Sequence, residues 1–143
     1  MDFLRTKTTV DATQPMGPLE SAVMDVVWSH GECNVHDVAK RLVRPLAYTT
    51  VMTTLDRLYK KGLLQRRKEE RAFFYLAAWT RVEWEQKRAG DLMAAFLAGP
   101  RPAGELLISC LVEAVGDEDA ALLDQLERKV HEKRKELSRK ERV

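Results

Sequence analysis

Apolar residues recur at helical spacing in three successive segments of the first half of the chain. The first segment spans residues 18–30 and is followed by Gly31, a residue type that commonly ends helices. The second segment is shorter and is expected to end at Arg44, because Pro45 disfavours helical backbone at the residue before it. The third segment spans residues 47–61. The pattern therefore predicts three helices in close succession.

The third predicted helix is amphipathic, with an apolar face and a face of hydroxyl-bearing and charged residues. Its apolar face consists of Val51, Leu55, Leu58 and Tyr59. Its polar face consists of Thr49, Thr50, Thr53, Asp56, Arg57 and Lys60. We expect the apolar face to lie in the core and the threonine-rich face to remain available for contacts with a ligand.

After Gly62 the pattern changes from helical spacing to two short alternating runs. Residues 72–77 are rich in aromatic and apolar positions, residues 63–68 combine two leucines with polar and basic residues, and residues 69–71 separate the two runs. This arrangement predicts a β-hairpin, although the strong Asn-Gly turn signal is absent. Three helices followed by a basic hairpin predict a winged helix-turn-helix, in which the hairpin is the wing.

Helical spacing returns in the second half of the chain. We expect a helix over residues 80–98 with Thr80 as its N-cap, a Gly- and Pro-rich break at 98–104, and helices over 105–115 and 119–139. Their apolar stripes need burial, and this half of the chain is too small to form a closed core. A second copy of the chain is expected to cover them. The dimerisation residues are Leu106, Leu107, Leu111, Leu123, Leu126, Val130 and Leu137.

The predicted fold is mainly α with a small β-hairpin wing, and it has three parts. Residues 1–17 are expected to be a flexible arm, 18–79 the winged-helix domain and 80–143 the helical dimerisation region. The alternative is a monomer in which the C-terminal helices fold back over the winged helix. A length of 143 residues, with 45% apolar and 32% charged residues, suits a small globular domain with an appendage. The absence of a membrane-length apolar run or a secretory signal predicts a cytoplasmic protein without membrane insertion.

Charge is distributed unevenly, although the net charge is only +2. Residues 40–71 contain ten Lys or Arg and three acids, a local net charge of +7, whereas residues 81–143 come to −1. A basic segment beside a threonine-rich helix is typical of a surface that contacts double-stranded DNA. The expected base-contacting residues are Thr49, Thr50, Met52 and Thr53. The expected phosphate and wing contacts are Arg57, Lys60, Lys61, Arg66, Arg67, Lys68 and Arg71.

No catalytic or metal-binding pattern is present. Cys33 and Cys110 are far apart, without a CxxC or CxC spacing, and both are expected to be structural and buried. The three histidines are scattered, and there is no Gly-rich phosphate loop or nucleophile motif. We therefore expect no enzyme activity, no cofactor and no metal.

Several segments resemble the BlaI/MecI penicillinase-repressor family, especially its actinobacterial members. These are Gly17–Trp28, Ala47–Leu64 and Arg71–Ala77, and the resemblance extends over roughly residues 17–140. It implies a homodimeric repressor of dyad operators with TACA/TGTA-type half-sites. On that pattern Thr49, Thr50, Met52 and Thr53 contact bases and Arg57 contacts a phosphate.

The resemblance also implies a mode of regulation. In the best-known members a membrane-bound metalloprotease sensor leads to cleavage of an Asn-Phe bond in the C-terminal region, which aligns here with Cys110-Leu111. Neither residue type matches, so relief by cleavage there or nearby is a hypothesis. The Cys-x-Cys motifs of copper-responsive relatives are absent, so copper control is not expected.

Three alternatives remain open at this point. One is a winged helix that contacts only proteins, although such modules typically lack a basic wing. Another is a ligand-sensing repressor with a pocket lined by Trp79, Trp84 and Phe96, although core packing also explains these side chains. The last is a redox-sensing repressor that uses Cys110.

Overall fold

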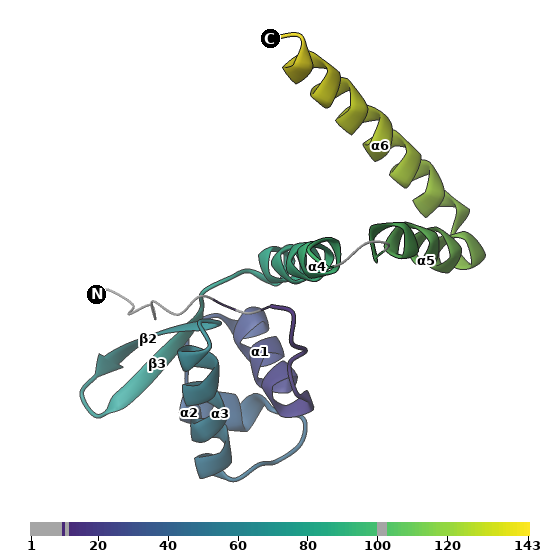
Figure 1. Cartoon of the computed structure of the whole chain (residues 1–143). Helices are drawn as coiled ribbons and strands as arrows, with labels where there is room; N and C mark the ends of the chain where they lie inside the picture. The colour runs from purple at the N-terminus through teal and green to yellow at the C-terminus, as the bar shows by residue number, and fades with distance from the viewer. Residues whose placement is uncertain (1–9, 11, 100–102) are drawn as a thin grey trace. The chain divides into compact units, whose positions relative to one another are not determined.

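The computed structural model describes residue 10, residues 12–99 and residues 103–143, and it divides into two compact units, Met1–Ala94 and Ala95–Val143 (Figure 1). The first unit contains α1 (Pro18–His30), β1 (Cys33–Asn34), α2 (Val35–Arg41), α3 (Tyr48–Lys60), β2 (Leu64–Glu69), β3 (Ala72–Ala77) and most of α4 (Arg81–Leu97). The second unit contains α5 (Ala103–Glu118) and α6 (Ala120–Glu141).

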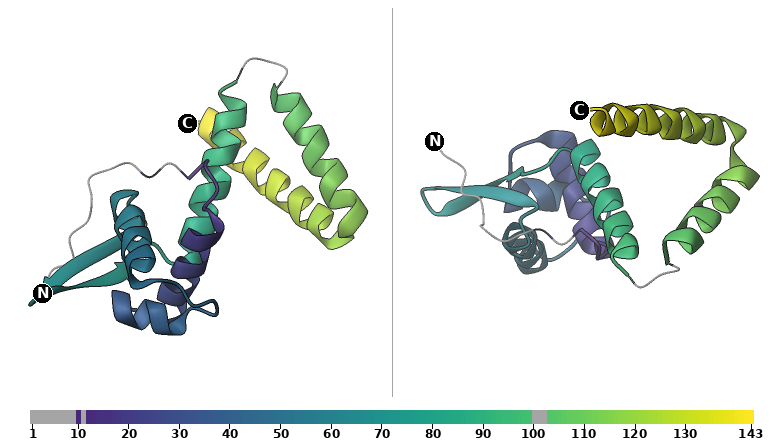
Figure 2. Two further views of the ribbon diagram at one scale, coloured as in Figure 1. Left: turned by 90° about the horizontal axis from the view of Figure 1, so that it is seen from below. Right: turned by 45° about the horizontal axis from the view of Figure 1, so that its top comes forward.

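The first unit has the predicted winged-helix topology. Strands β2 and β3 form an antiparallel hairpin in which Leu64 pairs with Ala77 and Glu69 pairs with Ala72. The hairpin extends away from the helices (Figure 2). A third strand, β1, pairs with β3 and gives the sheet order β1-β3-β2. Sequence analysis did not predict β1. The mainly α fold with a small wing is confirmed.

The helices of this unit begin and end close to their predicted limits. Helix α1 occupies the predicted residues, and Gly31 follows it with a φ of 77°, a left-handed conformation that favours glycine. Helix α2 ends at Arg41 rather than Arg44, because Leu42 is already extended. Asn34 starts α2 through a capping box: its side chain accepts from the Asp37 backbone N–H, and the Asp37 carboxylate accepts from the Asn34 N–H.

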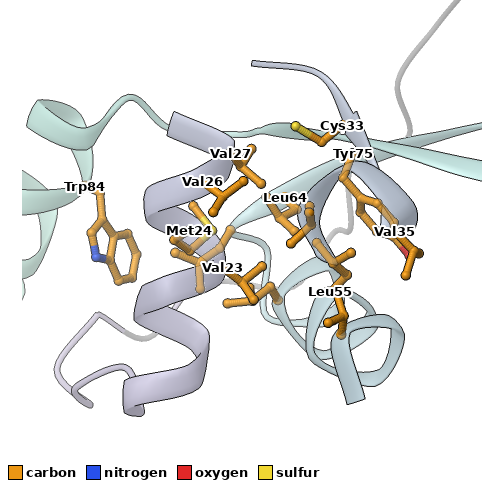
Figure 3. Packing of buried hydrophobic residues seen from close by; sticks show 14 of the residues in the cluster. Val23, Met24, Val26, Val27, Cys33, Val35, Leu55, Leu64, Tyr75 and Trp84 are labelled. Atoms are coloured by element: carbon orange, nitrogen blue, oxygen red, sulfur yellow. The ribbon is translucent and has the colours of Figure 1, made fainter. Parts of the chain in front are cut away.

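The core surrounds α1. Trp84 of α4 lies on one side of this helix, whereas Leu55, Leu64 and Tyr75 lie on the other (Figure 3). Two further interactions join α1 to the start of α4: the Trp28 indole donates to the Trp79 carbonyl at 2.9 Å, and Arg81 forms a 2.9 Å ion pair with Asp25. The compact unit therefore extends beyond residue 79, where we expected the domain to end.

The segment before α1 also contributes to the core. Ala12 is fully buried, and Val10 and Met16 pack against the buried cluster. Residues 1–9 and 11 of the expected arm lie outside the described residues. Three apolar residues of the described part of the arm are therefore used in packing.

The second unit contains the last residues of α4 together with α5 and α6, and α5 and α6 contact each other (Figure 2). Helix α5 continues through Gly116 to Glu118, although we expected this helix to end at residue 115. Asp119 caps α6 by accepting from the Ala121 backbone N–H. None of the side chains described in this unit is buried. Within the described residues, no helix has the length and apolar character needed to span a membrane.

Candidate DNA-binding surface

The N-terminal half of α3 presents the predicted base-contacting residues together. Thr49, Met52 and Thr53 are exposed, and Thr50 is half-buried. Core contacts by Val51, Leu55 and Leu58 on the opposite face hold this surface outward. The helix therefore displays short polar and apolar side chains of the kind that fit base edges in a major groove.

Two threonine hydroxyls of α3 donate to the helix backbone. Thr53 Oγ1 donates to the Thr49 carbonyl and Thr54 Oγ1 donates to the Thr50 carbonyl, each at 2.8 Å. Thr54 is buried, whereas the Thr53 side chain faces solvent. Since its hydrogen is used within the helix, the Thr53 hydroxyl offers outside partners an acceptor and its methyl group offers apolar contact.

The cations at the C-terminal end of α3 have different surroundings. Arg57 is exposed and forms no ion pair with any residue that the structure describes. Lys60 pairs with Asp56 at 2.9 Å, and Lys61 pairs with Glu20 of α1 at 2.8 Å. Because Lys60 and Lys61 are themselves largely exposed, both ammonium groups can also approach a phosphate.

Of the four wing residues predicted to contact DNA, two have side chains that point toward the protein. Arg66 pairs with Asp56 at 3.0 Å, and its side chain is only 21% exposed. Arg67 donates to Glu32 and Glu69, and its guanidinium lies 4.6 Å from the centre of the Phe74 ring. Both arginines therefore have intramolecular partners, which sequence analysis did not identify.

The other two wing cations are outward. Lys68 and Arg71 are exposed on the distal half of the hairpin. Lys68 lies over the Phe73 ring at 5.8 Å, whereas Arg71 forms no ion pair within the described part of the chain. Together with Arg57, they are the cations best placed to meet a polyanion.

Asp56 is the acidic residue of this surface that sequence analysis left without a role. The hydrogen bond from Lys60 lowers the pKa of its carboxyl most, the hydrogen bond from Arg66 lowers it further, and partial burial opposes both. The carboxylate thus remains charged at neutral pH and holds two cations, one on α3 and one on β2. The sequence carried no signal for this triad, because Asp56 and Arg66 are separated by a turn and a change of secondary structure.

The predicted dimerisation residues are solvent-accessible. Leu106, Leu111, Val130 and Leu137 are between 40% and 60% exposed, and the other three are half-buried: Leu107, Leu123 and Leu126. An apolar stripe of this extent is unusual on an isolated surface and is typical of a helix that packs against a partner.

Both cysteines are free thiols. Cys33 is buried as expected; burial raises the pKa of its thiol, and the neighbouring Arg41 acts in the opposite direction. The expectation of burial for Cys110 is wrong, because α5 lacks a covering layer and leaves this side chain and Leu111 exposed. Among the described residues, no group of three His, Cys, Asp or Glu side chains is arranged to hold a metal ion.

The three aromatic residues that we considered for a ligand pocket, Trp79, Trp84 and Phe96, have different surroundings. Trp84 is 3% exposed and Trp79 packs against the core, so both indoles are used in packing. Phe96 is 54% exposed and lies in the second unit.

The chain is similar in sequence to a known protein family and to several known proteins. A family model described as penicillinase repressor matches residues 16–131. The transcriptional regulator BlaI of Mycobacterium tuberculosis is 38% identical over 114 residues, covering 76% of this chain and 79% of that protein. The penicillinase repressor of Bacillus licheniformis is 32% identical over 82 residues, covering 56% of this chain and 64% of that protein.

A solved structure is also similar. It is the solution structure of the Bacillus licheniformis BlaI monomeric form in complex with the blaP half-operator, which is 33% identical and has a TM-score of 0.42. The similarity covers 50% of this chain and 89% of that chain.

Proposed function

Because the chain belongs to the penicillinase repressor family, we propose that it is a transcriptional repressor that binds double-stranded operator DNA as a homodimer. The observation that carries this proposal is the exposed, threonine-rich N-terminal half of α3 beside a wing with outward cations. Bound to its operator, such a protein blocks transcription by occupying the promoter.

We assign two kinds of DNA contact to this surface. Thr49, Thr50, Met52 and Thr53 contact base edges, since they lie where a recognition helix enters the major groove. The outward cations neutralise phosphates and supply most of the affinity. These cations are Arg57, Lys60, Lys61, Lys68 and Arg71.

The dimer is held by the C-terminal helices. The half-exposed stripe on α5 and α6 supports this role, because a second copy offers the same stripe for self-complementary packing. Two recognition helices held in this way bind half-sites about one helical turn, roughly 34 Å, apart. By the family pattern, these half-sites are of the TACA/TGTA type.

Repression is relieved when the dimer is lost. We propose that cleavage near Cys110 and Leu111, dependent on a membrane-bound metalloprotease sensor, separates the dimerisation helices from the DNA-binding unit. The exposure of Cys110 on α5 supports accessibility to a protease, and cutting there requires Leu111 to leave its proposed dimer contact and α5 to unwind locally.

Replacing one base-contacting residue and one phosphate-contacting residue tests the DNA assignment. Thr50→Ala is expected to change sequence preference while leaving the salt dependence nearly unchanged. Arg57→Ala is expected to weaken binding to operator and random DNA alike and to lower the salt slope by about 0.9 per lost phosphate contact. Affinity titrations at several salt concentrations measure both effects, and identical profiles for the two variants would reject the assignment.

A second candidate function, ligand-sensing repression, is favoured by a cavity in the first unit. A cavity of about 630 Å³ runs along one face of α1 beside the α2–α3 connection, and this volume lies in the usual range of about 300–1,000 Å³ for small-molecule sites. Its wall includes Leu19, Val26 and Leu46, and its charged lining residues are Arg41, Arg44 and Asp25, so arginines outnumber carboxylates. An amphipathic anion fits this combination of apolar wall and cations.

Aromatic carboxylates such as benzoate and naphthoate test the second candidate. A ligand-sensing repressor is stabilised by the compound and binds its operator more weakly in its presence. Leu46→Trp, which fills the cavity, should remove both effects. Unchanged melting temperature and operator affinity at millimolar compound would exclude sensing of this ligand class.

A further inference from the structure

Arg66 lies on the wing, but its guanidinium is surrounded by side chains of the protein. Its guanidinium lies 3.9 Å from the centre of the Tyr59 ring and 4.3 Å from the centre of the Phe73 ring. It also donates to the Asp56 carboxylate at 3.0 Å. Two rings and one carboxylate, contributed by α3 and β3, therefore surround a cation of β2.

The register of the hairpin explains this placement. Arg66 pairs with Tyr75 and Lys68 pairs with Phe73, so these side chains share the face of the hairpin that lies against α3. Arg67 pairs with Phe74 and points to the opposite face. Because side chains alternate between the two faces of a β-strand, Arg66 points toward α3, the proposed recognition helix.

We propose that Arg66 is a positioning residue that fixes the wing to the recognition helix through Asp56, Tyr59 and Phe73, and that it does not contact DNA phosphates. The inference rests on the DNA-binding function proposed above and refines it. A rotation of Arg66 toward a phosphate breaks the ion pair and both ring contacts, each of which is favourable for a guanidinium. The outward Lys68 and Arg71 then remain as the phosphate contacts of the wing.

Replacing Asp56 tests the proposal, because the two interpretations predict opposite changes in DNA affinity. A carboxylate on the DNA-facing helix repels phosphates, so electrostatics alone predicts that Asp56→Asn tightens DNA binding and frees Arg66 and Lys60 for phosphates. A positioning role predicts the opposite. Without the carboxylate, Arg66 keeps the Tyr59 ring contact but loses its ion pair with α3, so the wing becomes more mobile relative to this helix.

The main experiment compares matched arginine substitutions in the full-length protein. Arg66→Met and Arg71→Met remove the same charge from neighbouring parts of the wing. We expect Arg71→Met to lower the slope of log affinity against log salt by about 0.9. Arg66→Met and Asp56→Asn are each expected to weaken operator binding on the order of threefold to tenfold with an unchanged slope, since contacting residues couple at about this level.

A second measurement follows the wing without DNA. Heteronuclear NOE values for the backbone amides of residues 67–73 report its fast motion. They should fall in Asp56→Asn and Arg66→Met but not in Arg71→Met, while circular dichroism and melting confirm that all three variants fold. If the wild type binds no DNA at low salt, the proposed function fails, whereas the NOE comparison still decides whether Arg66 orders the wing.

Two results would overturn the proposal. One is tighter DNA binding by Asp56→Asn with a steeper salt slope. The other is a loss of slope in Arg66→Met equal to that in Arg71→Met, with wing amides as rigid as in the wild type.

Discussion

Glu70 has a backbone conformation that is uncommon for its side chain. It lies in the two-residue turn between β2 and β3 and has a φ of 55°. Most residues with a Cβ disfavour this left-handed region, whereas Gly tolerates it freely and Asn adopts it more readily than other side chains do. The turn therefore forms despite Glu70, because the strand pairs and ring contacts of the hairpin determine its geometry.

Glu70→Asn should stabilise the protein. Asn adopts the left-handed conformation at lower cost than an unbranched side chain, so the expected increase in the free energy of unfolding over Glu70→Gln is about 0.5–1 kcal/mol. Both variants remove the same charge and carry the same amide, which leaves turn preference as the difference between them. Urea unfolding at neutral pH measures it, and equal midpoints would show that the turn does not strain residue 70.

Sequence analysis succeeded at the residue level where a side chain is governed by its own helix. The exposed positions Thr49, Met52 and Thr53 follow from helical periodicity alone. The inward orientation of Arg67 could not be predicted, because one of its partners, Glu32, precedes it by 35 residues. Interactions of that range depend on the tertiary fold.

At the level of elements, α2 depends on its N-cap more than the other helices of the first unit do. It has seven residues, and few of its backbone N–H groups have partners within the helix. Asn34 and Asp37 satisfy two of the exposed donors through reciprocal hydrogen bonds. The pattern Asn34-x-x-Asp37 was a readable signal for the start of α2 that our sequence analysis did not use.

Asn34→Ala should destabilise the protein by about 1 kcal/mol, the usual cost of losing an N-cap acceptor. Asn34→Asp keeps an acceptor at the same position and is expected to retain most of the stability. Unfolding curves in urea for the wild type and both variants measure the difference. A loss in Asn34→Asp as large as that in Asn34→Ala would mean that the capping hydrogen bond is not the cause.

The link between α3 and the wing should make stability depend on acid pH. The Lys60 and Arg66 hydrogen bonds lower the pKa of Asp56 in the folded protein. Its contribution is therefore fully present above the unfolded carboxyl pKa of about 3.9 and is lost as the pH falls through the lower folded value. The stability difference between the wild type and Asp56→Asn should be constant from pH 7 to about pH 5 and shrink below about pH 4.

Denaturant midpoints for both proteins across this pH range test the linkage. The comparison cancels the effects of other carboxyl groups, since only Asp56 differs between the two proteins. A difference that stayed constant down to the lowest pH at which both fold would contradict the assignment of the ion pairs to Asp56.

The length and spacing of the helices and strands explain why some could be predicted from sequence and others could not. Helices α1, α2 and α3 were predicted because their apolar residues recur at helical spacing. Strand β1 has two residues and exists through its pairing with Tyr75 and Phe74, about forty residues later. Helix α5 passes through Gly116, which shows that one glycine lowers helix propensity without ending a helix.

At the level of the whole molecule, charge and apolar surface are separated along the chain. The basic residues concentrate in 40–71, whereas the apolar stripe that lacks a cover lies on α5 and α6. The exposed apolar side chains of the second unit are explained if a second copy covers them. Binding to a single half-site and dimerisation should therefore respond to different substitutions.

Leu126→Glu should break the proposed dimer. Leu126 occupies the seam of α6 between Leu123 and Val130, where a carboxylate in the interface would be desolvated without a partner. We expect the dimer dissociation constant to rise on the order of 100-fold or more. Sedimentation equilibrium measures this change directly.

Gln125→Glu is the matched control, since it adds the same charge at an exposed neighbouring position of the same helix. It should dimerise as the wild type does. Loss of the dimer should reduce affinity for a full dyad operator far more than affinity for a single half-site, because the two DNA-binding units are then no longer linked. A Leu126→Glu protein that stayed dimeric, or that bound the full operator as tightly as the wild type, would place the dimer contacts outside the α6 seam.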